Sequence, residues 1–229
     1  DKVLTVIAKK DVQNNLTGSY NNDDITGGNL ADTLRGGNGN DTINGGDGDD
    51  KLYGDNGNDV IYGGIGDDYI EGGNGDDKLY GGENDDTIHG GNGNDTIYGG
   101  TGDDKLYGEA GTNNFYFADG DGNDTVYSGS GSDILNFETA DFADMKFIRS
   151  GNDLIIQYND LGDTVTLANY AKSSKTSIKK IIDKNGVEHD IQSEITVLFD
   201  GIKGSKNNMA GTYMKDSITG GYYNDPING

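Results

Sequence analysis

The sequence predicts an all-β fold, a parallel β-solenoid of nonapeptide repeats with a β-rich capping segment at its C-terminal end. Three observations predict it. An aspartate recurs at every ninth position from Asp23 to Asp104, and an aliphatic residue such as Ile25 follows each aspartate by two positions. The residues between them are mostly Gly, Asn and Asp, which favour tight turns. A fixed period of this kind is typical of solenoid proteins.

The composition excludes several classes of protein. The 229 residues include 40 Gly and no Cys, and only 31% are hydrophobic, so neither a large apolar core nor disulfides can stabilise the fold. The net charge of −23 repels nucleic acid and anionic membranes and attracts cations. Such a chain could also be disordered. Disorder does not explain the common register of aspartates and aliphatic residues, so we expect it only without a cation.

The first elements in chain order are a leader or cap strand over residues 1–17 and then the repeat array over residues 18–136. In the unit 36–44, glycines at the first, second and fourth positions permit a tight turn, Asp41 closes the turn at the sixth position, and Ile43 at the eighth faces inward. The seventh and ninth positions must then face outward. If two units form one coil, residues 18 apart stack at about 4.8 Å, the spacing of adjacent strands.

This coil sorts the aspartates into two columns on opposite edges of the array. The first edge carries Asp23, Asp41, Asp59, Asp77 and Asp95, and the second edge carries Asp32, Asp50, Asp68, Asp86 and Asp104. Stacked carboxylates repel one another unless a cation lies between successive turns. A flexible site built from oxygen atoms favours Ca²⁺ over Mg²⁺ or Zn²⁺. Four adjacent pairs in each column predict about eight ions, which would leave a net charge of about −7.

The units match the pattern Gly-Gly-x-Gly-x-Asp-x-U-x, where U is a large aliphatic residue, over residues 18–136. The chain thereby resembles the RTX family of secreted bacterial proteins, which implies a right-handed parallel β-roll. By this resemblance, each Ca²⁺ is held by aspartates 18 residues apart, with carbonyls from the second and fourth positions of one turn and the first and third of the other. For Asp41 and Asp59 these carbonyls belong to Gly37, Gly39, Gly54 and Asn56.

The resemblance implies the same kind of carbonyl ligand along both edges. The residues concerned are Gly28, Leu30, Gly37, Gly39, Gly45, Gly46, Asp47, Gly48, Gly54, Asp55, Asn56, Gly57, Gly63, Gly64, Ile65, Gly66, Gly72, Gly73, Asn74, Gly75, Gly81, Gly82, Glu83, Asn84, Gly90, Gly91, Asn92, Gly93, Gly99, Thr101, Gly108 and Ala110. Two further aspartates that follow the regular array, Asp124 and Asp133, complete the predicted metal ligands.

Departures from the pattern predict where the array weakens. Leu30 and Asn84 replace Gly at the fourth position and Asp55 and Glu109 replace it at the second, so we expect strained or weaker turns there. Asn113 stands where an eleventh aspartate would be.

After Phe115 the register slips by two residues before it resumes with Asp124 and Asp133. The aromatic residues at the slip, Phe115, Tyr116 and Phe117, are expected to plug the open end of the roll.

Beyond residue 136 glycine becomes less frequent and the nine-residue repeat ends. Alternating segments at 145–148, 154–158, 164–167, 178–182 and 187–191 predict antiparallel strands within a cap at 137–200. This stretch resembles the β-rich segment that follows the repeats in RTX cytolysins, which implies that it nucleates folding. Residues 201–229 are expected to form a linker and degenerate repeats, with Asp216 and Asp225 again two residues before Ile. If they begin a new block, the chain is a fragment of a longer protein.

No sequence motif points to catalysis. The chain has no His-Glu-x-x-His, no Gly-x-Ser-x-Gly and no Cys, so we expect no enzyme activity. His89 is expected at an outward strand position, and His189 in a turn or at a strand edge. The sequence also has no apolar run long enough for a membrane span.

The resemblance implies a calcium-binding module that folds after export by type I secretion machinery. It would serve as the folding, secretion and stabilising domain of a bacterial toxin or adhesin, secreted or held on the cell surface. Two alternatives stay open. The chain could be the C-terminal accessory module of a secreted hydrolase, or it could bind host-cell glycans. The second alternative depends on four tyrosines spaced 18 apart on one face, Tyr62, Tyr80, Tyr98 and Tyr116. The opposite face carries a mixed row, Arg35, Tyr53, Glu71, His89 and Tyr107.

Overall fold

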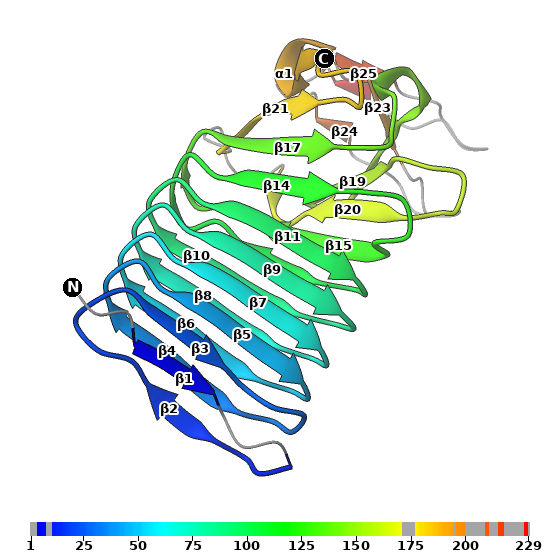
Figure 1. Cartoon of the computed structure of the whole chain (residues 1–229). Coiled ribbons are helices and arrows are strands. Elements are labelled where there is room, and N and C mark those ends of the chain that lie inside the picture. Colours follow the sequence, from blue (N-terminus) through cyan, green and yellow to red (C-terminus); the bar gives the residue numbers. More distant parts are fainter. Residues whose placement is uncertain are drawn as a thin grey trace.

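The protein is an elongated roll of parallel strands, seen in a computed structural model (Figure 1). The structure describes residues 4–7, 11–170, 177–194, 196–199, 209–210, 215–217 and 227–228. Within the roll, the chain crosses from one sheet to the other at each turn, so alternate strands belong to opposite sheets. The expected fold class, an all-β parallel roll with a β-rich end, is confirmed.

One sheet has ten strands, and its neighbours follow the order β1-β3-β5-β7-β9-β11-β14-β17-β21-β22. Their bounds are β1 (Leu4–Ile7), β3 (Asp23–Thr26), β5 (Thr42–Asp47), β7 (Val60–Ile65), β9 (Lys78–Glu83), β11 (Thr96–Thr101), β14 (Asn114–Phe117), β17 (Asp133–Phe137), β21 (Ile178–Ile182) and β22 (Glu188–Asp190).

The second sheet follows the order β2-β4-β6-β8-β10-β12-β15-β20-β19-β18-β23-β25, with β13 and β16 beside this path. Their bounds are β2 (Asn15–Thr17), β4 (Thr33–Asn38), β6 (Lys51–Asn56), β8 (Tyr69–Asn74), β10 (Thr87–Asn92), β12 (Lys105–Tyr107), β13 (Ala110–Gly111), β15 (Asn123–Tyr127), β16 (Ser130–Gly131), β18 (Lys146–Ser150), β19 (Asp153–Gln157), β20 (Thr164–Leu167), β23 (Thr196–Phe199) and β25 (Lys215–Ser217).

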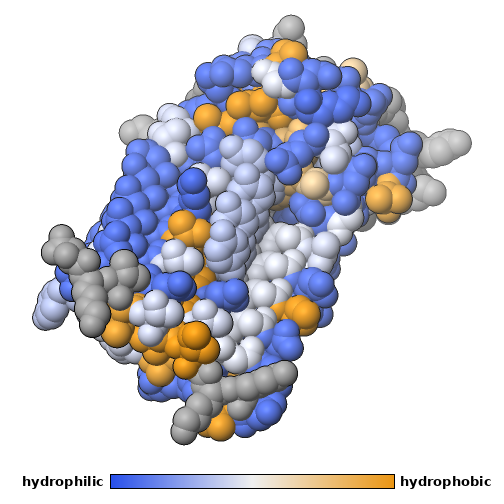
Figure 2. Space-filling view, viewed as in Figure 1, coloured by the Kyte–Doolittle hydropathy of each residue, from blue (hydrophilic) through white to orange (hydrophobic). Residues whose placement is uncertain are grey.

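The register confirms that two units make one coil. Ile43 pairs with Ile61 in the ten-stranded sheet, and Leu52 pairs with Ile70 in the other, an offset of 18 residues in each sheet. The predicted slip is also present, because Lys105 pairs with Thr125, 20 residues on. Outward side chains of similar hydropathy consequently form rows along the roll (Figure 2).

Each of the two sheets contributes a single layer of side chains to the core between them. Each unit contributes a single aliphatic residue with 0% of its surface exposed. These residues are Ile25, Leu34, Ile43, Leu52, Ile61, Ile70, Leu79, Ile88, Ile97 and Leu106. So narrow a core buries little apolar surface per residue, so the turns must contribute to stability as well.

The expected aromatic plug at the end of the roll is wrong. Phe115 and Phe117 are buried, but they lie inside a coil that continues into β15 and β17. Phe117 packs against Phe137 at 5.3 Å between ring centroids, and Phe137 packs against Tyr158 of the cap at 5.0 Å. Tyr116 faces outward, because it alternates with its two buried neighbours along the strand. Phe115 and Phe117 thus fill the core at the coil that precedes the two-residue insertion.

The expectation that the cap strands are antiparallel is correct for only some of them. Strands β18, β19 and β20 form an antiparallel meander, and β21 and β22 form a hairpin. However, β20 pairs in parallel with β15, and β21 pairs in parallel with β17. The cap therefore extends both sheets of the roll before it turns away from them.

The described helical residues form a 3₁₀ turn at Phe142–Asp144 and α1 (Ile191–Glu194), and Tyr170 is also in 3₁₀ conformation. No helix among them is long and apolar enough to cross a membrane. Most of the expected degenerate repeats at 201–229 lies outside the described residues. Within them, β24 (Met209–Ala210) pairs in parallel with β26 (Ile227–Asn228) at the 18-residue offset of the roll.

Candidate metal centre

The turns on both edges depend on left-handed backbone at the second and fourth positions. Gly37 and Gly39 have φ angles of 111° and 118°, which an L-residue with a side chain adopts only with strain. Three of the predicted departures nevertheless take this conformation, Asp55 at 71°, Asn84 at 82° and Glu109 at 59°. Leu30 is not in the left-handed region, so its turn has a different shape.

Each column aspartate is bonded to the coil before it through one carboxylate oxygen. The backbone N–H of Asp41 donates to Asp59 Oδ1 at 2.7 Å, and that of Asp50 donates to Asp68 Oδ1 at 2.8 Å. This bond repeats from Asp23 to Asp133 on the first edge, with Asn113 in the series, and from Asp32 to Asp124 on the second. The side chains are thereby fixed in two columns and almost entirely buried.

The second carboxylate oxygen, Oδ2, is buried without a hydrogen-bond partner in nine of these aspartates. They are Asp41, Asp50, Asp59, Asp68, Asp77, Asp86, Asp95, Asp104 and Asp133. A buried polar atom without a partner is costly, and a charged one more so. The repetition of the same unpartnered atom from coil to coil indicates that a ligand outside the chain completes it.

A carbonyl oxygen converges on this carboxylate oxygen in six of these turns. A Cβ added to Gly63, at the first position, would lie under 3.0 Å from both Asp68 Oδ2 and the carbonyl oxygen of Gly81 in the next coil. The same holds at Gly36, Gly45, Gly54, Gly72 and Gly81. Only glycine leaves room for this approach of two oxygen atoms. Carboxylate and carbonyl oxygens together are the ligands that Ca²⁺ prefers.

The predicted third-position carbonyls also have a hydrogen-bond partner within the chain. Third-position carbonyls already accept a backbone N–H from the preceding coil, as Asn56 does from Gly39 at 2.9 Å and Ile65 does from Gly48 at 2.7 Å. The same bond engages Asn74, Glu83, Asn92, Thr101 and Ala110. A carbonyl oxygen has two lone pairs, so these residues keep one for a cation.

Burial is the largest cause that raises the pKa of the column carboxyls. The pKa rises to about 6 for Asp41, Asp68 and Asp77. It rises to about 7 for Asp50, Asp59, Asp95 and Asp104, and to about 8 for Asp86. The backbone N–H bond lowers these values, and charged neighbours in the column raise them further. A positive partner close to these carboxyls would therefore stabilise their charged form.

At the N-terminal ends of the columns, the chain itself satisfies the carboxylate. Asp23 Oδ2 accepts the backbone N–H of Ser19 at 2.5 Å, and Asp32 Oδ2 accepts that of Gly28 at 2.8 Å.

At the other ends, different groups replace the next aspartate. The Asn113 amide donates to Gly108 O at 2.9 Å and to Asp133 Oδ1 at 3.1 Å, which places a neutral donor where a cation would be. In the cap, buried Val165 is in register with Asp124 of the second column. Burial raises the pKa of Asp124 to about 9. Sequence reasoning identified neither the Asn113 amide bonds nor this role of Val165.

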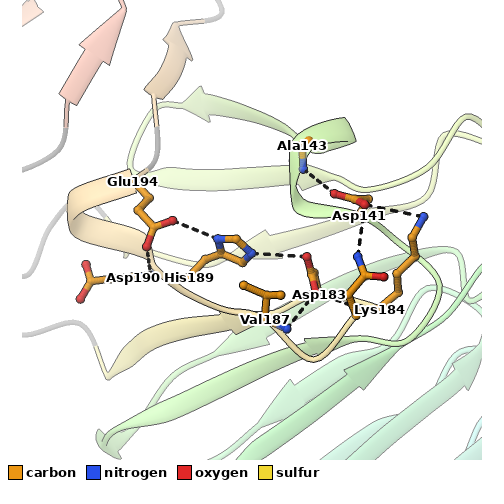
Figure 3. Close-up of polar contacts among 9 residues, drawn as sticks. Asp141, Ala143, Asp183, Lys184, Val187, His189, Asp190 and Glu194 are labelled. Atoms are coloured by element: carbon orange, nitrogen blue, oxygen red, sulfur yellow. Dashed lines mark hydrogen bonds and ion pairs between the residues drawn. The ribbon is translucent and has the colours of Figure 1, made fainter.

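The two histidines lie outside the metal columns. His89 stacks on Tyr107 at 4.3 Å between ring centroids, and its Nδ1 lies 2.8 Å from Glu109 Oε1. In the cap, His189 lies between two carboxylates (Figure 3). Its Nδ1 is 2.9 Å from Glu194 Oε2, and its Nε2 is 3.4 Å from Asp183 Oδ2.

The His189 ring also stacks on Phe142 at 3.8 Å between centroids. Against the effect of burial, backbone hydrogen bonds and the bond with His189 hold the pKa of Asp183 below the ordinary range of a carboxyl. The bond with His189 and a backbone bond do the same for the pKa of Glu194. These contacts fasten α1 and the hairpin of β21 and β22 to the 3₁₀ turn. His189 thus has a structural role at a strand edge, as its sequence position suggested.

The raised carboxyl pKa values predict that protons can partly replace a cation. These carboxyls bind protons more tightly in the folded chain than in the unfolded one, where the pKa is about 4. In calcium-free buffer, the resulting stability is complete below about pH 4 and is lost as pH rises through 6 to 8. We expect the far-UV circular dichroism of chelator-treated protein to show β structure at pH 4.5 and to lose it by pH 8. Equal signals at both pH values would contradict this expectation.

A second prediction concerns the close approach at the first position. Gly63→Ala places a methyl group between Asp68 Oδ2 and the Gly81 carbonyl, so the calcium-loaded chain should lose roughly 1–3 kcal/mol of folding free energy and bind one ion fewer. Thermal unfolding in saturating Ca²⁺ and ion counting by equilibrium dialysis measure the two effects. Gly151→Ala is the control, because its Cβ meets no atom within 4 Å and only the left-handed φ of 60° costs energy. An unchanged ion count in Gly63→Ala would remove this site from the column.

Comparison with known proteins agrees with this geometry. The family model for the RTX calcium-binding nonapeptide repeat (4 copies) matches residues 17–52, 26–61, 45–79, 53–88, 62–97, 80–115 and 116–138. No curated protein matches the chain.

Among solved structures, the chain is similar to the extracellular lipase LipA from Serratia marcescens, with 21% identity and a TM-score of 0.30. The likeness covers 64% of this chain and 37% of the lipase, so the chain spans well under half of that protein. The family match runs from residue 17 to residue 138, more than half of the sequence, and overlies the two columns of buried aspartates. The chain belongs to the RTX calcium-binding nonapeptide repeat family.

Proposed function

We propose that this calcium-binding module is a folding switch, which stays extended without calcium and forms the roll when calcium is present. The observation that carries the proposal is the repeated buried Oδ2 atom without a protein partner. Eight of these atoms, from Asp41 to Asp104, belong to the regular columns, and they support about eight ions. Asp133, the ninth, follows Asn113 in the first column. The side-chain amide of Asn113 donates a hydrogen bond to Oδ1 of Asp133.

The mechanism is the linkage of ion binding to folding. In the unfolded chain the carboxylates are apart and hydrated, whereas the roll stacks them at the spacing of adjacent strands. Bound calcium supplies the positive charge that this stacking requires. The roll alone brings Oδ2 and the first-position carbonyl together, so binding favours the folded state. At a hundredfold excess over the dissociation constant, each independent site adds about 2.7 kcal/mol, so several sites suffice.

This switch suits a protein exported by type I secretion. A cytosol low in calcium would keep the chain extended for transport, and calcium outside the cell would fold it. We therefore propose a secreted or cell-surface protein, with this module as the folding and stabilising part of a toxin or adhesin. A secreted hydrolase is the alternative parent. We further propose that the module itself acts by binding and not by catalysis, which the structural contacts of His189 support.

The proposal predicts a steep and cooperative calcium dependence of folding. Far-UV circular dichroism at pH 7.5 should change from an unfolded spectrum in chelator to a β spectrum in millimolar Ca²⁺. Mg²⁺ at the same ionic strength is the control, because it gives up its bound water reluctantly and should not fold the chain. A β spectrum that is the same in chelator and in Ca²⁺ would refute the switch.

The tyrosine row is the second candidate function, as a glycan-binding surface. Tyr62, Tyr80, Tyr98 and Tyr116 stack with centroid distances of 4.9, 4.9 and 4.5 Å and interplanar angles of 12° to 14°. Their ring faces therefore cover one another and leave mainly ring edges at the surface. A sugar that packs on an aromatic face would have to separate two stacked rings. We propose that this row stabilises the roll.

A structural role for the tyrosines predicts a stability effect. The double variant Tyr80→Ala, Tyr98→Ala removes all three stacked pairs and should lower the stability of the calcium-loaded roll by roughly 1–3 kcal/mol. Thermal unfolding in saturating Ca²⁺ measures the loss. A glycan array probed with both proteins tests the alternative. Array binding by the unsubstituted chain that the double variant loses, with stability unchanged, would support glycan recognition.

A further inference from the structure

The two edges of the roll carry unequal charge around the same backbone. At the fifth position, directly before the column aspartate, four consecutive turns of the second edge have Asp49, Asp67, Asp85 and Asp103. The matching turns of the first edge have Asn40, Asn58, Asp76 and Asn94. The six turn positions of these four units carry ten carboxylates on the second edge and six on the first. The second edge is therefore the more negative.

The geometry at the fifth position is the same on both edges. On the second edge, the backbone N–H of Asp85 donates to Asp67 Oδ1 at 3.2 Å. On the first edge, that of Asn58 donates to Asn40 Oδ1 at 3.0 Å. Equivalent bonds join the other fifth-position residues, and all of these side chains are exposed. Asn and Asp are interchangeable in this bond, because only an oxygen acceptor is used. The edges thus differ in charge and not in shape.

The exposed carboxylates act on the buried columns. Asp49, Asp67, Asp85 and Asp103 each directly precede a column aspartate of the second edge, and backbone bonds between coils fix them in a row beside that column. On the first edge only Asp76 occupies this place. The fixed hydrogen bonds keep each exposed carboxylate one residue from a column aspartate, where a cation bound to the column is attracted by it as well.

We propose that the two edges form two classes of calcium site, and that Asp49, Asp67, Asp85 and Asp103 make the second edge the tighter class. This inference rests on the proposed function, because it ranks sites that the proposal assigns. At low salt and in a water-like dielectric, one extra negative charge close to a divalent ion changes its affinity by roughly threefold to tenfold. Extra carboxylates beside each ion on the second edge therefore separate the two classes by at least about tenfold.

The test starts from the folded, calcium-loaded full chain. Stopped-flow mixing with the fluorescent chelator Quin-2 at pH 7.5 and low salt counts the ions released and times their release. We expect two phases of similar amplitude, a fast phase from the first edge and a slow phase from the second, at least about fivefold apart. In 0.5 M KCl the two rates should approach each other, because salt screens exposed charges.

Isosteric variants assign the phases to the edges. Asp49→Asn, Asp67→Asn, Asp85→Asn and Asp103→Asn together should move the slow phase toward the fast rate and leave the fast phase unchanged. Asn40→Asp, Asn58→Asp and Asn94→Asp together should move the fast phase toward the slow rate. Both sets keep the fifth-position hydrogen bonds, so both variants should fold.

The control neutralises three exposed carboxylates that are not adjacent to a column aspartate, with Glu71→Gln, Asp144→Asn and Asp160→Asn. It should change both phases by less than about twofold. Release of all ions in one phase would overturn the inference, as would edge variants that change both phases by the same factor. If the unsubstituted chain neither folds nor takes up Ca²⁺, the proposed function fails first, and the two failures are thereby distinguished.

Discussion

The structure depends on one constraint, which is that each column aspartate from Asp41 to Asp104 is buried with only one of its two carboxylate oxygens satisfied by the chain. Oδ1 accepts a backbone N–H from the preceding coil, so the aspartate cannot swing out to solvent without breaking a bond between coils. Oδ2 is left against a glycine and a carbonyl oxygen, with no donor from the chain. The first-position glycines follow from this constraint, because a Cβ there would enter the space between the two oxygens.

The thin core follows from the same arrangement. One aliphatic residue in nine is buried, so stacked coils gain little from the hydrophobic effect and must gain from their turns. The columns therefore have to end in groups that need no cation. Ser19 and Gly28 supply backbone N–H donors at the start, and near the other end Asn113 supplies an amide and the cap supplies Val165.

Most of the fold that could be predicted from the sequence follows from the repeat, because the repeat is a pattern of residues close together in the chain. The nine-residue period, the interval of 18 and the slip of two residues near Phe115 all follow from residue patterns alone. The parallel attachment of the cap does not, because Leu135 pairs with Ile181 and Asn123 pairs with Thr164 across long intervals without a repeat. The sequence could not predict the different roles of Oδ1 and Oδ2 either. It gives the place of each aspartate in the repeat but not the direction in which each carboxylate oxygen points.

The shared aspartates also explain why the ions should act together. Asp59 accepts the N–H of Asp41 through Oδ1, donates its own N–H to Asp77, and directs Oδ2 toward the first-position carbonyl of the next coil. One coil thus contributes to the contacts below it and above it. An ion that orders one turn also positions half of the ligands of the neighbouring ion. The next ion therefore binds with a smaller loss of conformational entropy. Cooperativity along an edge is then a consequence of the backbone, and charge sets how the two edges differ.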